Sequence, residues 1–289
     1  MLRAVILILA LALAGVAEAR TPAEILAASR PEEWRAIPPE RLLLMRLANG
    51  GEVVIELAPN FAPRAAANVG RLARSGYYDG LAVLRVQDNY VTQWGDPAAG
   101  TAQARTPPSG FGPIPAEFSL PRRAAPFVRL QERDAYAPEI GFSGGMPAAR
   151  NRREIWLAHC YAMVGVGRDN APDSGDGREL YVVIGHAPRH LDRNITLVGR
   201  VISGMEQLAA LPRGSGPLGF YTETEQPAPI ASVRVAADIP GVRWEALREN
   251  SASFKELLDS RRNRREAWFV RPSDAIDLCN APLPARRLP

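Results

Sequence analysis

AVLRVQDNYVTQWGDP, residues 82–97, is the most informative segment of this 289-residue chain. Two apolar runs flank Asp88 and Asn89, which are typical turn residues, so the segment predicts a β-hairpin. Arg85 interrupts the first run and Gln93 interrupts the second. An arginine on a strand is most often an edge residue or half of an ion pair, so Arg85 alone identifies no site.

The second strand of this hairpin changes the interpretation. Val91 and Gln93 share one face because side chains alternate along a strand, and Tyr90 lies beside the turn. If Arg85 packs beside them, an apolar surface carries two fixed hydrogen-bonding groups. Such a surface suits a neutral, mostly apolar ligand that has a carbonyl group.

Regular elements surround this hairpin. Residues 41–59 predict another hairpin, because Leu-, Val- and Ile-rich runs flank Asn49-Gly50-Gly51. Residues 62–80 predict a helix that begins at Pro63 and ends at Gly76. Further segments predict strands at 154–167, 179–185 and 231–239, and a strand, glycine turn and short helix within 191–211. We therefore expect a mainly β fold, an antiparallel sheet closed into a barrel with helices at its ends.

Three segments lie outside this regular pattern. Residues 20–40 are Pro-rich and polar, and we expect them to form a loose lead-in. We expect residues 98–155 to form a long, loop-rich insertion with one short ordered piece at 114–119. An insertion of this length is normally functional or elaborates a core fold. In the C-terminal extension, 241–289, Leu247, Phe254, Leu257 and Leu258 share one face of an amphipathic helix expected over 245–266, which packs on the domain or on a partner.

The first nineteen residues have the pattern of a signal peptide. Arg3 supplies a positive charge, residues 4–16 are apolar, and Ala17-Glu18-Ala19 offers a cleavage site. We therefore expect an exported, periplasmic protein with no stable membrane insertion after cleavage. The alternative is an uncleaved membrane anchor.

Composition excludes other classes. The net charge is only +4, and the basic residues are not interleaved with stacking aromatics, so we expect no nucleic-acid partner. The histidines are His159, His186 and His190, and Pro188 disfavours a helix that would align the last two. We therefore expect surface or packed histidines, no metal site and no cofactor.

The chain has two cysteines, Cys160 and Cys279. An even pair in an oxidising compartment indicates a disulfide. Cys160 lies in an apolar run, however, and an inert buried thiol is an equal alternative.

The segment YYDGLAVLRVQDNYVTQWGDP resembles the central motif of the cyclophilin-type peptidyl-prolyl isomerases, usually written YxxxxFHRxxxxFxxQxGDP. The resemblance extends over about 42–239, through GEVVIELAPNFAPRAAANVGRLARSGYYDG and through AMVGVG…ELYVVIG…HLDRNITLVGRVISGMEQL. It implies a closed eight-stranded antiparallel barrel capped by two helices, within an isomerase domain of residues 41–240.

The resemblance also assigns roles to residues. Arg85 matches the catalytic arginine and Gln93 the pocket glutamine, followed by the structural Gly95 and Asp96. The remaining substrate-binding positions are Tyr90, Val91, Val164, Gly165, Tyr181 and Leu191. Departures occur at Val83 and Leu84, which replace Phe-His, and at the candidate specificity positions Glu179, His190 and Ile195.

The implied chemistry needs only these residue types. Rotation about an X-Pro bond breaks amide resonance against a barrier of about 18–20 kcal/mol. A guanidinium aimed at the twisted proline nitrogen stabilises that form over either planar one, without a covalent step or a metal.

We therefore expect a peptidyl-prolyl cis-trans isomerase that acts on proline-containing polypeptides among exported proteins. One alternative is a catalytically weak peptide-binding or chaperone module that uses the same groove. Another is an assembly role in which the helix at 245–266 docks a partner. Tyr90 and Tyr181 stand where the family has Phe, so the positions of their rings and hydroxyl groups determine whether the pocket keeps its shape.

Overall fold

The computed structural model describes residues 20–264 and 268–289. The predicted signal peptide, residues 1–19, and the end of the predicted helix at 265–266 lie outside the described residues. Within the described part, no helix is both long enough and apolar enough to cross a bilayer.

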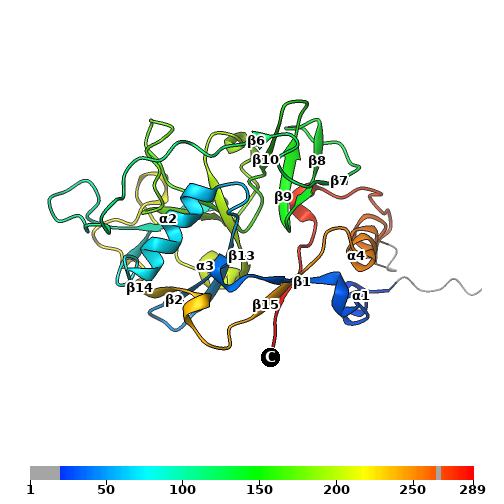
Figure 1. Ribbon diagram of the computed structural model, residues 1–289, viewed down its shortest axis with the longest axis horizontal. Coiled ribbons are helices and arrows are strands. Elements are labelled where there is room, and N and C mark those ends of the chain that lie inside the picture. Colours follow the sequence, from blue (N-terminus) through cyan, green and yellow to red (C-terminus); the bar gives the residue numbers. More distant parts are fainter. Residues whose placement is uncertain (1–19, 265–267) are drawn as a thin grey trace, which may run out of the picture.

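An eight-stranded antiparallel sheet forms the main body of the protein (Figure 1). Its spatial order is β14-β2-β3-β13-β11-β12-β5-β4. The strands are β2 (Leu42–Leu47), β3 (Glu52–Leu57), β4 (Ala82–Val86), β5 (Val91–Gly95), β11 (Met163–Val166), β12 (Leu180–Val183), β13 (Leu197–Ser203) and β14 (Ile230–Val235). A bridge between Ala82 and Pro229 brings the two edges together, so the sheet is a nearly closed barrel. This confirms the predicted fold class.

Two helices pack on this barrel, α2 (Pro63–Arg74) and α3 (Met205–Ala209). Pro63 occupies the first turn of α2, where its missing N–H costs no hydrogen bond. The carboxylate of Glu117 accepts hydrogen bonds from the backbone N–H groups of Arg64 and Ala65, at 3.0 and 2.9 Å. The ordered piece predicted at 114–119 thus caps the start of α2.

The insertion contains a sheet of its own. Strands β6 (Leu120–Pro121), β7 (Val128–Leu130), β8 (Glu139–Ser143), β9 (Met146–Arg150) and β10 (Glu154–Leu157) pair in the order β6-β10-β9-β8-β7, which is the green sheet beside the barrel in Figure 1. The expectation of irregular loops holds for residues 98–119 and is wrong for 120–155. These strands are short and carry Gly141, Pro147 and several arginines, so their alternation of apolar and polar residues is too weak to be recognised in the sequence. The strand expected at 154–167 is in fact two, β10 and β11, separated by a turn at Ala162, where φ is 70°.

A third sheet joins the two ends of the chain. Strand β1 (Trp34–Ile37) pairs with β15 (Trp244–Leu247), which pairs with β16 (Ala285–Arg287). Helix α1 (Pro22–Ala27) lies beside α4 (Ala252–Arg262) (Figure 1). The lead-in at 20–40 is therefore ordered, contrary to expectation, because β1 pairs with β15. The expectation was wrong because this partner strand lies more than two hundred residues away in the sequence.

The predicted C-terminal helix is shorter than expected. Ser251 caps α4 by accepting a hydrogen bond from the N–H of Phe254 at 3.1 Å, and Leu247 belongs to β15 instead. The apolar face of α4 is buried against the inserted sheet, where the ring of Phe254 contacts Phe142 edge-on. The first of the two predicted packing modes, packing on the domain, is therefore observed.

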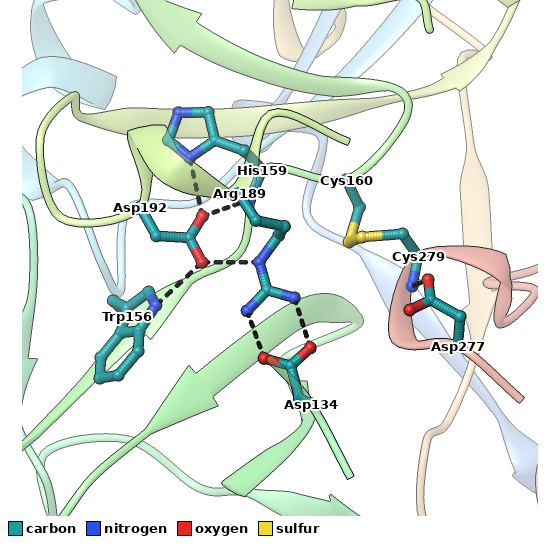
Figure 2. Close-up of a disulfide and its surroundings, with 8 residues drawn as sticks. All are labelled: Asp134, Trp156, His159, Cys160, Arg189, Asp192, Asp277 and Cys279. Atoms are coloured by element: carbon teal, nitrogen blue, oxygen red, sulfur yellow. Dashed lines mark hydrogen bonds and ion pairs between the residues drawn. A yellow bond between two sulfur atoms is a disulfide. The ribbon is translucent and has the colours of Figure 1, made fainter. Parts of the chain in front are cut away.

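Single turns of 3₁₀ helix connect several elements: η1 (Pro31–Glu33), η2 (Pro39–Arg41), η3 (Arg189–Leu191), η4 (Pro217–Gly219), η5 (Ala236–Asp238) and η6 (Leu278–Asn280). A disulfide joins Cys160, between β10 and β11, to Cys279 in η6 (Figure 2). Of the two alternatives for the cysteines, the disulfide is the one observed.

Candidate active site

Four predicted site residues form a row across four neighbouring strands. Arg85 on β4 is paired with Gln93 on β5, Gln93 with Tyr181 on β12, and Tyr181 with Gly165 on β11. Residues paired in register point to the same face of a sheet. The sheet therefore brings together side chains that are up to 96 positions apart in the sequence.

The next row faces the opposite way, into the core of the barrel. It consists of Val86, Thr92, Val182 and Val164, all of which are buried. The side chain of Val164 is thus part of the core, and only its backbone can contact a ligand. The Arg85 row lies on the outer face.

The guanidinium of Arg85 is half-buried and held from three sides. Its Nε donates to the carbonyl oxygen of Leu218 at 2.6 Å, and one terminal nitrogen donates to Oε1 of Gln93 at 3.0 Å. The other terminal nitrogen donates to the side-chain oxygen of Gln87. The ring of Phe220 lies 5.4 Å from the guanidinium carbon. Burial lowers the pKa of Arg85, but an arginine stays charged at neutral pH.

Gln93 links Arg85 to Glu179. Its amide oxygen accepts from Arg85 and its amide nitrogen donates to the carboxylate of Glu179. Burial raises the pKa of Glu179, and the hydrogen bond from Gln93 opposes that shift. Glu179 thus bonds to Gln93, and the acceptors of the Arg85 guanidinium are Leu218, Gln93 and Gln87.

An apolar cluster lies beside this row. Val91, Tyr181 and Val183 are buried together, and Tyr90 and Ile195 pack against them. Tyr90 lies 5.6 Å from the Arg85 guanidinium carbon. The cluster thus combines predicted binding and specificity positions on one surface.

The other predicted site residues lie outside the Arg85 row. His190 is exposed and stacks on Tyr90, with ring centroids 6.5 Å apart, whereas Leu191 is half-buried in η3. The carboxylate of Asp96 accepts from the backbone N–H groups of Ala98 and Arg105, so its role is to fix the turn after Gly95. Val83 is buried in the core.

Two hollows of about 330 and 220 Å³ lie elsewhere, next to the disulfide, and none of the residues in the Arg85 row lines them. The surface around Arg85 is nevertheless the candidate site. An extended peptide binds along a surface and needs no enclosed cavity, and the oriented guanidinium lies on that surface.

A buried histidine lies behind this site, and sequence reasoning assigned it no role. His159, which the sequence suggested was surface or packed, has no exposed surface and makes a hydrogen bond of 2.9 Å to the hydroxyl of Tyr181. Its other ring nitrogen bonds to Asp192 at 3.0 Å (Figure 2). Phe220 and Leu218, which flank Arg85, were also missed because they lie in a loop without a motif. Among the described residues no group of three His, Cys, Asp or Glu side chains is placed to hold a metal.

Comparison with known proteins identifies the family. The family model described as cyclophilin type peptidyl-prolyl cis-trans isomerase/CLD matches residues 42–235. A probable peptidyl-prolyl cis-trans isomerase of Brucella suis is 28% identical over 187 residues, which cover 62% of this chain and 76% of that protein. The human peptidyl-prolyl cis-trans isomerase-like 1 is 26% identical over 216 residues, covering 74% and 99%.

A similar solved structure covers the additional segments as well. The crystal structure of the cyclophilin AquaCyp293 from Hirschia baltica matches with a TM-score of 0.71 and 27% identity, over 93% of this chain and 97% of that one. The match thus extends beyond the barrel. The chain belongs to the cyclophilin-type peptidyl-prolyl cis-trans isomerases.

Proposed function

We propose that this isomerase acts on X-Pro bonds of exported proteins and that Arg85 is its catalytic residue. The observation that carries the proposal is the guanidinium itself, fixed by Gln93, Gln87 and Leu218 at the border of an apolar cluster. Fixed donors cost little reorganisation when the reaction needs them.

Arg85 has donors left for a substrate. A guanidinium carries five N–H groups, and the three contacts within the described part of the chain use three of them. Two N–H groups therefore remain to meet the twisted amide. In that form the proline nitrogen has regained its lone pair, which can accept a hydrogen bond.

The apolar cluster supplies the second requirement. Val91, Tyr181 and Ile195 offer carbon atoms to a proline ring, and the ring of Tyr90 flanks the guanidinium. A proline held there has its nitrogen near Arg85. Charge that stabilises only the twisted form accelerates rotation in both directions, because cis and trans share one transition state.

The proposed clients are exported proteins. Residues 1–19 carry the pattern of a signal peptide, and the disulfide between Cys160 and Cys279 is a bond typical of oxidising compartments such as the periplasm. Fractionation of cells that express the full chain tests this: a cytoplasmic protein with free thiols would contradict it.

The catalytic assignment is tested by isomerisation of a short Ala-Pro peptide. Arg85→Ala should lower kcat/KM by about 10²- to 10³-fold, as loss of a fixed transition-state donor does elsewhere. Arg85→Lys should recover part of it, since lysine keeps the charge but lacks the planar fork. The exposed Arg46 provides the control variant Arg46→Ala, which should match the wild type.

Equal rates for the wild type and Arg85→Ala would refute the assignment. Peptide binding by the wild type without any acceleration would instead select the alternative, a peptide-binding or chaperone module.

A further inference from the structure

A chain of buried polar side chains begins at Tyr181 in the apolar cluster. The hydroxyl of Tyr181 lies 2.9 Å from Nε2 of His159. Nδ1 of His159 lies 3.0 Å from the carboxylate of Asp192, which also accepts the backbone N–H of His159 at 2.9 Å. All three side chains are buried.

The chain continues from Asp192 into the inserted sheet (Figure 2). The second oxygen of Asp192 accepts from Nε of Arg189 at 2.7 Å and from the indole N–H of Trp156 at 3.2 Å. Arg189 in turn forms two hydrogen bonds to Asp134, at 2.9 and 3.2 Å. Trp156 lies on β10, and Asp134 lies between β7 and β8.

The partners fix the direction of each hydrogen bond. Burial lowers the pKa of His159, so its ring is neutral at neutral pH and carries a single proton. Burial alone would raise the pKa of Asp192, but His159 and Arg189 bring it below its usual value, so Asp192 is an acceptor. Nδ1–H therefore donates to Asp192, and the bare Nε2 accepts the hydroxyl proton of Tyr181.

Gly165 makes this arrangement sterically possible. A Cβ atom added at Gly165 would lie 2.2 Å from both Cζ and Oη of Tyr181. The ring of Tyr181 therefore lies directly against β11, and its hydroxyl reaches the buried ring of His159. The ring carbons, and not the hydroxyl, are left for the apolar surface.

We propose that His159 is a positioning residue for proline binding: by accepting the Tyr181 hydroxyl it holds that ring as the apolar floor beside Arg85, and the inserted sheet supports it through Asp192. This inference rests on the proposed function of the Arg85 site. It assigns a role to the insertion, whose Trp156 and Asp134 hold the far end of the chain.

Two substitutions of His159 separate the loss of the hydrogen bond to Tyr181 from the loss of the imidazole ring itself. The amide of His159→Asn ends near the position of Nδ1, so it can keep the bond to Asp192 but cannot reach Tyr181. The longer His159→Gln places a polar group near the position of Nε2. Each is made in the wild-type and in the Tyr181→Phe background, and kcat, KM and affinity for an Ala-Pro peptide are measured.

In the wild-type background, His159→Asn should lower kcat/KM about tenfold, which corresponds to the loss of one well-formed buried hydrogen bond. His159→Gln should retain most of the wild-type kcat/KM. The loss should appear in KM, because the floor contacts the substrate in its planar and twisted forms alike. In the Tyr181→Phe background the two variants should be equal. Tyr161→Phe, which alters an exposed ring, should match the wild type.

Equal losses in both backgrounds, or no loss for His159→Asn, would overturn the proposal. If the His159 variants do not fold, Tyr181→Phe alone decides. It should raise KM and shift the ¹⁵N resonance of His159 Nε2, and an unchanged KM would refute positioning. Should Arg85→Ala prove fully active, the catalytic assignment fails, while the peptide affinities of the His159 and Tyr181 variants still test the floor.

Discussion

The contact between Gly165 and Tyr181 makes a single methyl group an informative perturbation. In Gly165→Ala the new Cβ would lie 2.2 Å from the Tyr181 ring, whereas ordinary van der Waals contact begins at 3.4 Å. The ring must therefore move by 3.4 − 2.2, or about 1.2 Å. A shift of that size along the hydrogen bond to His159 would stretch it from 2.9 Å to 2.9 + 1.2, or about 4.1 Å, which is too long for a hydrogen bond.

Both consequences lower stability. Overpacking a well-filled site costs about 1–3 kcal/mol, and leaving the buried ring nitrogen of His159 without its donor costs about another 1 kcal/mol or more. The free energy of unfolding should therefore fall by about 2–4 kcal/mol. The displaced ring also enters the space where a proline would bind, so kcat/KM should fall by about tenfold or more.

Urea unfolding and the Ala-Pro isomerisation assay measure the two effects separately. The matched control is Gly70→Ala in α2, the same chemical change at a position where an added Cβ meets nothing within 4 Å. That variant should be more stable by about 0.5–1 kcal/mol, because alanine favours a helix, and its kcat/KM should be unchanged. If Gly165→Ala unfolds and turns over like the wild type, the ring of Tyr181 does not lie against β11.

Two further outcomes are expected. Replacing Cys160 and Cys279 together by Ser opens a loop with a sequence separation of 119, so the free energy of unfolding in urea should fall by about 4–5 kcal/mol on the chain-entropy model; a reductant should then destabilise the wild type and leave the variant unaffected. Hydrogen bonds from the backbone N–H of Arg30 and from Ser253 lower the pKa of Glu33 from 4.5 to about 2, so this carboxylate stabilises the fold above pH 4.5 and loses that effect as the pH falls towards 2. The stability difference between wild type and Glu33→Gln should accordingly shrink over that range, and a constant difference would contradict the assignment.

The barrel could be predicted because the sequence signals for its strands, turns and helix each lie within a short segment. The turn at Asn49-Gly50-Gly51, the proline that starts α2 and the alternation in β3 each act within a few residues. Arg85 and Gln93 are eight residues apart on one hairpin, so the motif that contains them also fixes their geometry. Sequence reasoning therefore identified the pair of residues on which the proposed catalytic role rests.

The supporting structure depends on pairs that are distant in sequence. Trp34 pairs with Leu247, and no local pattern relates a short strand near one end of the chain to another near the opposite end. Asp192 is 33 residues from His159, and Asp134 is 55 residues from Arg189. A buried polar residue looks in sequence like a misplaced surface residue until its partner is known, which is why His159 could be assigned no role from the sequence.

Tyr181 shows how one polar atom in an apolar floor determines its surroundings. A buried hydroxyl needs an acceptor, which His159 supplies; a neutral imidazole then needs an acceptor at Nδ1, which is Asp192. The charge of Asp192 requires Arg189, and Asp134 accepts one hydrogen bond from each terminal nitrogen of Arg189 beside the hollow next to the disulfide. Because each group satisfies the one before it, Tyr181→Phe would not simply restore the phenylalanine floor of the family. It would leave Nε2 of His159 buried without a hydrogen-bond donor, and an unpaired buried polar atom is the main cost of removing a buried hydrogen bond.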